Sequence, residues 1–295
     1  MTIVERTILK LREQQRTDET HRPPETPNTS KSDDVRPGAG SPRPQHQAIT
    51  LERRALRAAG LLPPEEDMEL LARQYRKIKR PLVAHAIGRG VPRALRGHLL
   101  MIASAMAGEG KSFTAINLAL SLAREKDLEV LLVDADVAKP QLSHVLGLAD
   151  APGLLDALRN PDSAVESLIY TTDIPTLSFL PAGAGADEAT ELLSSGRMEQ
   201  LTERLGQRSH LIVVFDSPPL LQTTEAAALA HAAGQIIVVV RAESTPQPVL
   251  LDALNVLEGH PSVSLVLNQS MRSATAEYYY YHYGSGSGDS HEATD

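Results

Sequence analysis

The sequence contains no cysteine and no tryptophan among its 295 residues. The absence of cysteine excludes disulfides, thiolate metal sites and cysteine nucleophiles. No uncharged apolar run reaches the roughly 20 residues that a membrane-spanning helix needs, and charged residues interrupt the first 14 positions, unlike the apolar core of a signal peptide. The formal net charge of −8 argues against a general nucleic-acid binder. We therefore expect a soluble, cytoplasmic protein that binds no nucleic acid.

The first 50 residues of the chain differ in composition from the rest. Residues 1–15 place apolar side chains near one face, which predicts a short amphipathic helix. Such a helix packs on its own domain or docks on a partner or membrane surface, and the sequence leaves both open. Residues 16–50 are rich in proline, serine, threonine and charged residues, which predicts a disordered linker because little apolar surface is available for burial.

A helical extension is predicted over residues 51–96. Helical patterns at 51–60 and 65–83 flank the pair Pro63 and Pro64. The second pattern carries a run of basic residues, which is most often a solvated face but also fits an oligomer contact.

Alternating strands and helices then predict one large domain over residues 97–271, followed by a flexible tyrosine-rich tail over 272–295. The strands are continuous apolar runs, which indicates burial on both faces. We therefore predict an α/β fold with a parallel β-sheet sandwiched by helices. The predicted strands are 99–103, 130–133, 176–180, 211–215, 235–240 and 263–267.

A glycine-rich run at residues 104–112 reads Ser-Ala-Met-Ala-Gly-Glu-Gly-Lys-Ser and lies between a predicted strand and a predicted helix. This is the setting of a P-loop, in which backbone amides and a helix N-terminus bind nucleotide phosphates. Lys111 is expected to reach the β- and γ-phosphates, and the Ser112 hydroxyl to ligate Mg²⁺. Ala105 stands where the usual pattern has its first glycine. The predicted nucleotide-binding residues are Gly108, Glu109, Gly110, Lys111, Ser112 and Phe113.

Three aspartates stand at the ends of predicted strands, with Asp134 and Asp136 after one strand and Asp216 after another. Because ligands bind outside the carboxyl ends of parallel strands, we expect all three beside the P-loop. One such aspartate is as often a helix N-cap, but three favour a cluster whose mutual repulsion a dication offsets. We predict that Ser112, Asp134 and Asp216 hold the metal. Lys111 and the three aspartates are the predicted catalytic residues, with Asp134 or Asp136 accepting a proton or supporting the metal.

The order of these motifs resembles the bacterial tyrosine kinases of exopolysaccharide biosynthesis, which share their P-loop architecture with the MinD/ParA-type ATPases. Asp134-Ala135-Asp136 is similar to the extra motif of that family, called Walker A′. The resemblance covers about residues 65–283. It implies that the chain binds ATP and Mg²⁺, that it transfers the γ-phosphoryl group to tyrosine hydroxyls, and that Asn268 contacts the adenine base. Further matching segments are 139–140, 152–154, 191–195, 215–219 and 267–268.

Five of the seven tyrosines lie close together in the polar, glycine-rich tail. Such a cluster is either an aromatic sticker for a partner surface or, as the resemblance favours, a set of phospho-acceptors. Each phosphate adds nearly two negative charges, so several in a row repel one another and the acidic cluster. We hypothesise that phosphorylation releases the tail and dissociates an oligomer. The predicted acceptors are Tyr278, Tyr279, Tyr280, Tyr281 and Tyr283.

Residues 3–6 and 74–82 narrow the resemblance to the autokinases of exosortase-associated exopolysaccharide loci. In these systems the kinase and its membrane activator are separate chains. The resemblance therefore implies a chain-length-determinant (Wzz-like) membrane activator, a cognate tyrosine phosphatase, a homo-oligomer, and recruitment to the inner face of the plasma membrane. It also implies a role in regulating polymer chain length and export. Ala138 departs from the family, in which many members carry arginine, and Lys139 follows it.

Two other functions fit parts of the pattern. A MinD/ParA-type regulatory ATPase would hydrolyse ATP without tyrosine transfer, but that family usually has a second lysine early in its P-loop. This chain has Ala105, Met106 and Ala107 there. A non-catalytic scaffold is the other alternative, and the intact Lys111 and the three aspartates weigh against it.

Overall fold

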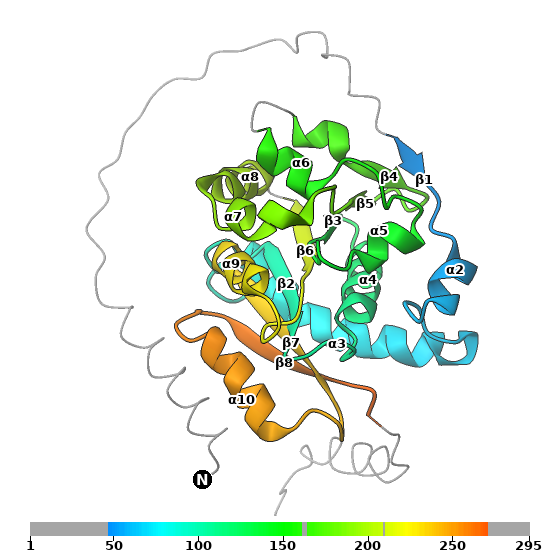
Figure 1. Ribbon diagram of the computed structural model, residues 1–295. Coiled ribbons are helices and arrows are strands. Elements are labelled where there is room, and N and C mark those ends of the chain that lie inside the picture. Colours follow the sequence, from blue (N-terminus) through cyan, green and yellow to red (C-terminus); the bar gives the residue numbers. More distant parts are fainter. Residues whose placement is uncertain (1–46, 161–163, 209, 271–295) are drawn as a thin grey trace, which may run out of the picture. The chain divides into compact units, whose positions relative to one another are not determined.

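The computed structural model describes residues 47–160, 164–208 and 210–270. These residues form an eight-stranded sheet of order β1-β4-β5-β3-β6-β2-β7-β8 (Figure 1). Every neighbouring pair is parallel except β4 and β5, which are antiparallel. The strands are β1 (Ala48–Ile49), β2 (Leu99–Ser104), β3 (Glu129–Asp134), β4 (Tyr170–Thr172), β5 (Leu177–Leu180), β6 (Leu211–Asp216), β7 (Gln235–Arg241) and β8 (Val263–Asn268).

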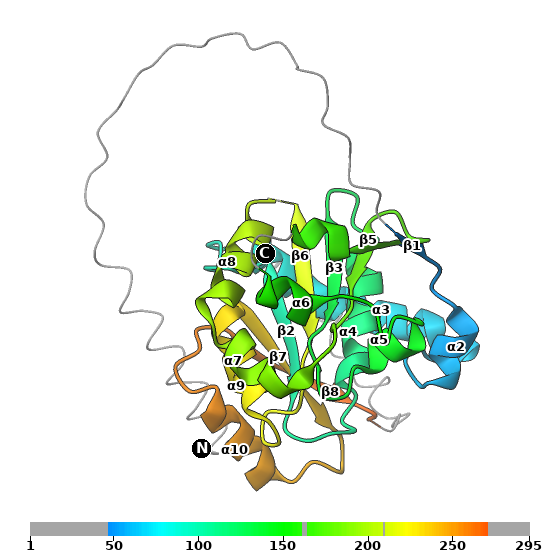
Figure 2. The ribbon, with the colours of Figure 1, turned by 45° about the horizontal axis from the view of Figure 1, so that its top comes forward.

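Helices cover both faces of the sheet, which confirms the predicted α/β sandwich (Figures 1 and 2). Side chains from α2, α3, α4 and α5 join the apolar core on one face, and those from α6 to α10 join the core on the other. The helices are α2 (Arg53–Ala58), α3 (Met68–Ile87), α4 (Lys111–Leu122), α5 (Gln141–Val145), α6 (Leu154–Arg159), α7 (Ala189–Leu193), α8 (Gly196–Gly206), α9 (Thr224–Ala232) and α10 (Gln247–Val256), with short 3₁₀ turns at Glu65–Asp67, Val165–Leu168 and Ala186–Glu188.

The apolar strands β2, β3, β6 and β7 are buried on both faces over most of their length, as predicted. The prediction is wrong for β8, the edge strand, in which Leu265 and Leu267 are exposed because only one neighbouring strand and few helical side chains cover it. In β2, Leu99 and Met101 face one core while Leu100 and Ile102 face the other, and all six residues of the strand are buried. Because successive side chains of a strand point to opposite faces, only a strand with helices on both sides can bury every position.

Two strands were not predicted. β1 and β4 contain only two and three residues, too few to show a pattern. β1 lies within the residues 16–50 that composition assigns to a linker, and its pairing with β4 corrects the end of that segment. Local composition gave no sign of β1 because the strand is stabilised by pairing with residues over a hundred positions away.

Helix α3 continues beyond the predicted 65–83 and passes through Pro81. Proline lacks an amide hydrogen and disfavours a helix interior. Here Leu82, Val83 and Ala86 are buried against the sheet, and this packing keeps the segment helical. The helix ends at Gly88, whose φ of 73° is left-handed and typical of a glycine C-cap. The first helix of the extension is shorter than predicted and spans Arg53–Ala58 only.

The predicted helix at 1–15 and the tyrosine tail lie outside the described residues. Within the part of the chain that the structure describes, no helix combines the length and the apolar character needed to cross a membrane.

Candidate active site

The glycine-rich run forms the turn between β2 and α4, at the carboxyl edge of the sheet. Gly108 and Gly110 have φ values of 82° and 97°, in the left-handed region that favours glycine. A Cβ atom on Gly110 would overlap the side-chain amide of Asn268. The predicted strand–loop–helix is therefore present, and two of its glycines are required by backbone geometry and by close approach.

The loop presents a set of free amides. Among the described residues, none of the backbone N–H groups of 107–112 donates a hydrogen bond to the protein. They lie at the N-terminus of the 12-residue helix α4, where the helix dipole favours negative charge. Lys111 begins the helix and is largely buried. Free amides, a helix N-terminus and a buried lysine together make an anion site of the kind that phosphates occupy.

Two of the predicted aspartates meet directly beside this loop. Asp134 ends β3 and Asp216 ends β6, and the two are register partners on adjacent strands. Both are fully buried. The Asp134 Oδ2 atom accepts hydrogen bonds from the amide and the hydroxyl of Ser143, each at 2.8 Å. Its Oδ1 atom and both oxygens of Asp216 find no hydrogen-bond donor in the described part of the chain. Two neighbouring buried aspartates therefore carry three unpaired carboxylate oxygens.

The electrostatics of this pair favour protonation when no cation is near. Burial raises the pKa of Asp134 to about 6, while the hydrogen bonds from Ser143 oppose the rise. Burial raises the pKa of Asp216 well above its ordinary value, and the charge of Asp134 raises it further. Ser112 and Lys111 favour the ionised form of Asp216, but not by enough to restore an ordinary pKa. A cation at this point would remove the penalty for ionising both groups.

Asp136 occupies a different environment from the other two aspartates. It is partly exposed, and Lys139 donates its backbone amide to Oδ1 at 3.3 Å. Burial raises its pKa, Lys111 and Lys139 lower it, and the charge of Glu225 raises it. The structure thus brings all three predicted aspartates to the loop, with one of them within reach of a ligand from solvent.

The unpaired oxygens fit the ligand set that Mg²⁺ prefers. Within residues 47–270, where described, no group of three or more histidine, aspartate or glutamate side chains is arranged to hold a metal alone. Mg²⁺ at phosphate sites usually keeps several waters and takes only one or two carboxylates, with phosphate oxygens completing its shell. Asp216, Asp134 and the hydroxyl of Ser112 are sufficient for that role.

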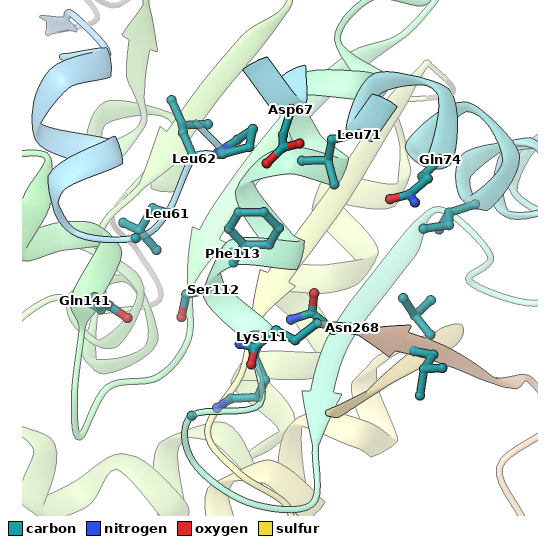
Figure 3. Close-up of a pocket in the computed structure, with 18 of the residues that line it drawn as sticks. Leu61, Leu62, Asp67, Leu71, Gln74, Lys111, Ser112, Phe113, Gln141 and Asn268 are labelled. Atoms are coloured by element: carbon teal, nitrogen blue, oxygen red, sulfur yellow. The ribbon is translucent and has the colours of Figure 1, made fainter. Parts of the chain in front are cut away.

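An open cleft of about 2610 Å³ extends from the loop along α3. Figure 3 shows Lys111, Ser112 and Asn268 at the loop, with Phe113 beyond them toward Leu62. Asn268, predicted to contact a base, ends β8 and donates its side-chain amide to the backbone oxygen of Glu109 at 3.0 Å. It therefore lies against the phosphate loop and lines the cleft.

Sequence reasoning missed two residues that contact the predicted site. Ser143 binds Asp134 across nine positions of the chain, and the hydroxyl of Thr245 donates to the side chain of Glu109 across more than a hundred. Neither serine nor threonine belongs to a recognisable motif at these places, so no local signal marked them. Both positions became visible only when the strands were assembled.

Comparison with known proteins gives a family match over the core of the fold. The model of an AAA domain matches residues 97–257. The tyrosine-protein kinase ptk of Acinetobacter johnsonii is 32% identical over 181 residues, which are 61% of this chain and 24% of that protein. This chain therefore spans about a quarter of the length of that relative.

Two further matches extend over most of the length of the matched protein or domain. The tyrosine-protein kinase YwqD of Bacillus subtilis (strain 168) is 30% identical over 215 residues, which are 72% of this chain and 87% of that protein. Among solved structures, the BceF tyrosine kinase domain is 27% identical with a TM-score of 0.58, covering 73% of this chain and 86% of that domain. The similarity includes the segment in which the phosphate loop and the three aspartates lie.

Proposed function

This chain belongs to the family of bacterial tyrosine-protein kinases that carry an AAA domain, and on that premise we propose that it transfers the γ-phosphoryl group of ATP to tyrosine hydroxyls. The observation that carries the proposal is the juxtaposition of free loop amides and Lys111 with the unpaired oxygens of Asp134 and Asp216. This arrangement combines a phosphate site with a cation site, as phosphoryl transfer requires.

Each group has a distinct task in the proposed reaction. The amides of 107–112 and the ammonium of Lys111 bind the phosphate oxygens and offset their charge. Ser112, Asp134 and Asp216 hold Mg²⁺, which when bound neutralises charge on the β- and γ-phosphates. Asn268 contacts the adenine base from the end of β8. Phe113 lines the adjoining cleft.

The proton of the attacking phenol goes to Asp136. This carboxylate is partly exposed, whereas Asp134 is fully buried and one of its oxygens is occupied by Ser143. The phenolic oxygen forms a bond to the γ-phosphorus as the bond to the β-γ bridging oxygen breaks. ADP leaves, and the proton rests on the Asp136 carboxylate before passing to solvent.

We propose that the acceptors are the five tail tyrosines at 278–281 and 283, and that their phosphorylation regulates exopolysaccharide chain length and export. A membrane chain-length-determinant protein would activate the kinase and recruit it from the cytoplasm to the plasma membrane. A cognate phosphatase would reverse the modification. Residues 51–96 and 97–271 would form the kinase domain, and phosphorylated tails would dissociate a homo-oligomer by charge repulsion.

Labelled ATP tests this proposal directly. The purified full chain is incubated with Mg²⁺ and γ-labelled ATP, with and without a membrane chain-length-determinant protein, and the label is mapped by residue. We expect label on the tail tyrosines, no label in Lys111→Met, and normal label in Lys126→Met, which removes an exposed lysine after α4. ATP turnover without phosphotyrosine in either condition would instead indicate a regulatory ATPase.

A further inference from the structure

The phosphate loop contains a carboxylate at its centre. Glu109 lies between the two left-handed glycines, and only 4% of its surface is exposed. A free negative charge in a loop built to bind phosphates repels them, and a buried charge is costly unless hydrogen bonds satisfy it. The loop therefore needs a device that holds this carboxylate in place.

The hydrogen bonds of Glu109 supply such a device. Its Oε2 atom accepts from the backbone amide of Met106 at 2.8 Å. Its Oε1 atom accepts from the hydroxyl of Thr245. The hydroxyl oxygen of Thr245 in turn accepts a hydrogen bond from the backbone amide of Arg241 at 3.1 Å. Both carboxylate oxygens are thus occupied, one inside the loop and one by the segment between β7 and α10.

A second contact ties the same elements together. The backbone oxygen of Glu109 accepts a hydrogen bond from the side-chain amide of Asn268. The backbone oxygen of Asn268 in turn accepts a hydrogen bond from the backbone amide of Ala242. The loop, the β7–α10 segment and the end of β8 are therefore joined through one residue. Hydrogen bonds to a charged acceptor are stronger than neutral ones. The Met106 and Thr245 contacts both have this advantage, and Thr245 is the one of the two that fixes the carboxylate from outside the loop.

We propose that Thr245 is a positioning residue of the nucleotide site. Its hydroxyl holds the Glu109 carboxylate away from the phosphate position and in contact with the Met106 amide. The backbone amides of 107–112 then remain free to bind the ligand. The phosphate loop is thereby preorganised before nucleotide arrives, which lowers the entropic cost of binding. The part of this inference that concerns affinity rests on the proposed nucleotide binding.

Two substitutions separate the hydroxyl from the rest of the side chain. Thr245→Val keeps the shape and removes the donor and acceptor, whereas Thr245→Ser keeps both. Thr190→Val is the control for loss of a threonine hydroxyl, because the Thr190 hydroxyl bonds to Thr224 at 3.1 Å and not to the loop. Binding of a fluorescent ADP analogue to the full chain with Mg²⁺ is measured by titration. We expect about tenfold weaker binding for Thr245→Val, as for loss of one charge-assisted hydrogen bond, and changes below twofold for the other two.

A second readout needs no nucleotide. Hydrogen exchange of the Met106 amide, followed by NMR on the nucleotide-free chain, reports whether Glu109 still holds the loop. We expect at least tenfold faster exchange in Thr245→Val than in the wild type or Thr245→Ser. Unchanged exchange and unchanged affinity in Thr245→Val would overturn the inference. If the wild type itself binds no nucleotide, the proposed function fails, and the exchange measurement still decides whether Thr245 positions the loop.

Glu109→Gln tests whether the effect passes through the carboxylate. In this background the repulsive charge is gone, so Thr245→Val should change ADP affinity by less than twofold. An undiminished tenfold effect would show that Thr245 acts by another route and would contradict the proposed positioning role.

Discussion

Replacing Asp134 with asparagine should stabilise the nucleotide-free fold while it destroys the metal site. Burial raises the pKa of this carboxyl from 3.8 to about 6. At 1.36 kcal/mol per pH unit, that rise corresponds to about 3 kcal/mol by which the fold disfavours the ionised form. Asparagine is neutral and nearly the same shape, and its side-chain oxygen can still accept both hydrogen bonds from Ser143.

The sign of the effect depends on pH. Because the folded pKa of Asp134 lies above the unfolded one, the folded state binds more protons between these values, and wild-type stability falls as pH rises from about 4 to about 6. Below about pH 4 the carboxyl is protonated in both states, so the two proteins should be equally stable there. At pH 8, Asp134→Asn should exceed the wild type by up to about 3 kcal/mol in free energy of unfolding.

Urea unfolding of the nucleotide-free, metal-free chain between pH 4 and pH 8 measures this difference. The chain has no tryptophan, so circular dichroism is the appropriate signal. Asp150→Asn, which removes an exposed carboxylate, serves as the control and should leave the pH dependence unchanged. A variant that is less stable than the wild type at pH 8, or that keeps the wild-type pH dependence, would refute the reasoning. The same variant should lose Mg²⁺-dependent phosphorylation, so that stability and activity change in opposite directions.

Three further substitutions test two contacts at the site and one at the opposite edge of the sheet. Gly110→Ala forces a side chain into a left-handed conformation and against Asn268, so the affinity for ADP should fall at least tenfold in fluorescence titration, and the free energy of unfolding in urea should fall by about 1–2 kcal/mol. Ser143→Ala removes a hydroxyl that donates to buried Asp134 and should destabilise the protein by about 1–3 kcal/mol at pH 8; a smaller loss at pH 4, where the carboxyl is neutral, would support the charge-based explanation. Gln235→Ala breaks two buried hydrogen bonds to backbone carbonyls and should cost about 1–3 kcal/mol in the same assay without altering the affinity for nucleotide.

The sequence alone predicts the parts of the site that depend on the order of strands, turns and helices along the chain. A continuous apolar run, a glycine loop and a helical pattern must fold as strand, turn and helix, since each is specified by neighbouring residues. Parallel strands then bring their carboxyl ends to one edge, so chain order alone predicts that Asp134 and Asp216 lie beside Lys111. The structure confirms the sheet, its helical covering and the meeting of these three residues.

The sequence indicated less about elements whose stability comes from distant partners. Strands β1 and β4 are too short for a pattern, and α3 continues past Pro81 because the buried side chains that follow outweigh the lost hydrogen bond. In both cases tertiary packing overrides a local preference.

The sequence by itself determined which chemical groups gather at the edge of the sheet, because strand ends, glycine turns and helix starts are local properties of the chain. Only the tertiary structure decided how those groups are held. Ser143 occupies one oxygen of Asp134, and Thr245 occupies one oxygen of Glu109. Such contacts depend on the relative placement of packed elements to within a fraction of an ångström, and no periodicity or motif encodes that placement.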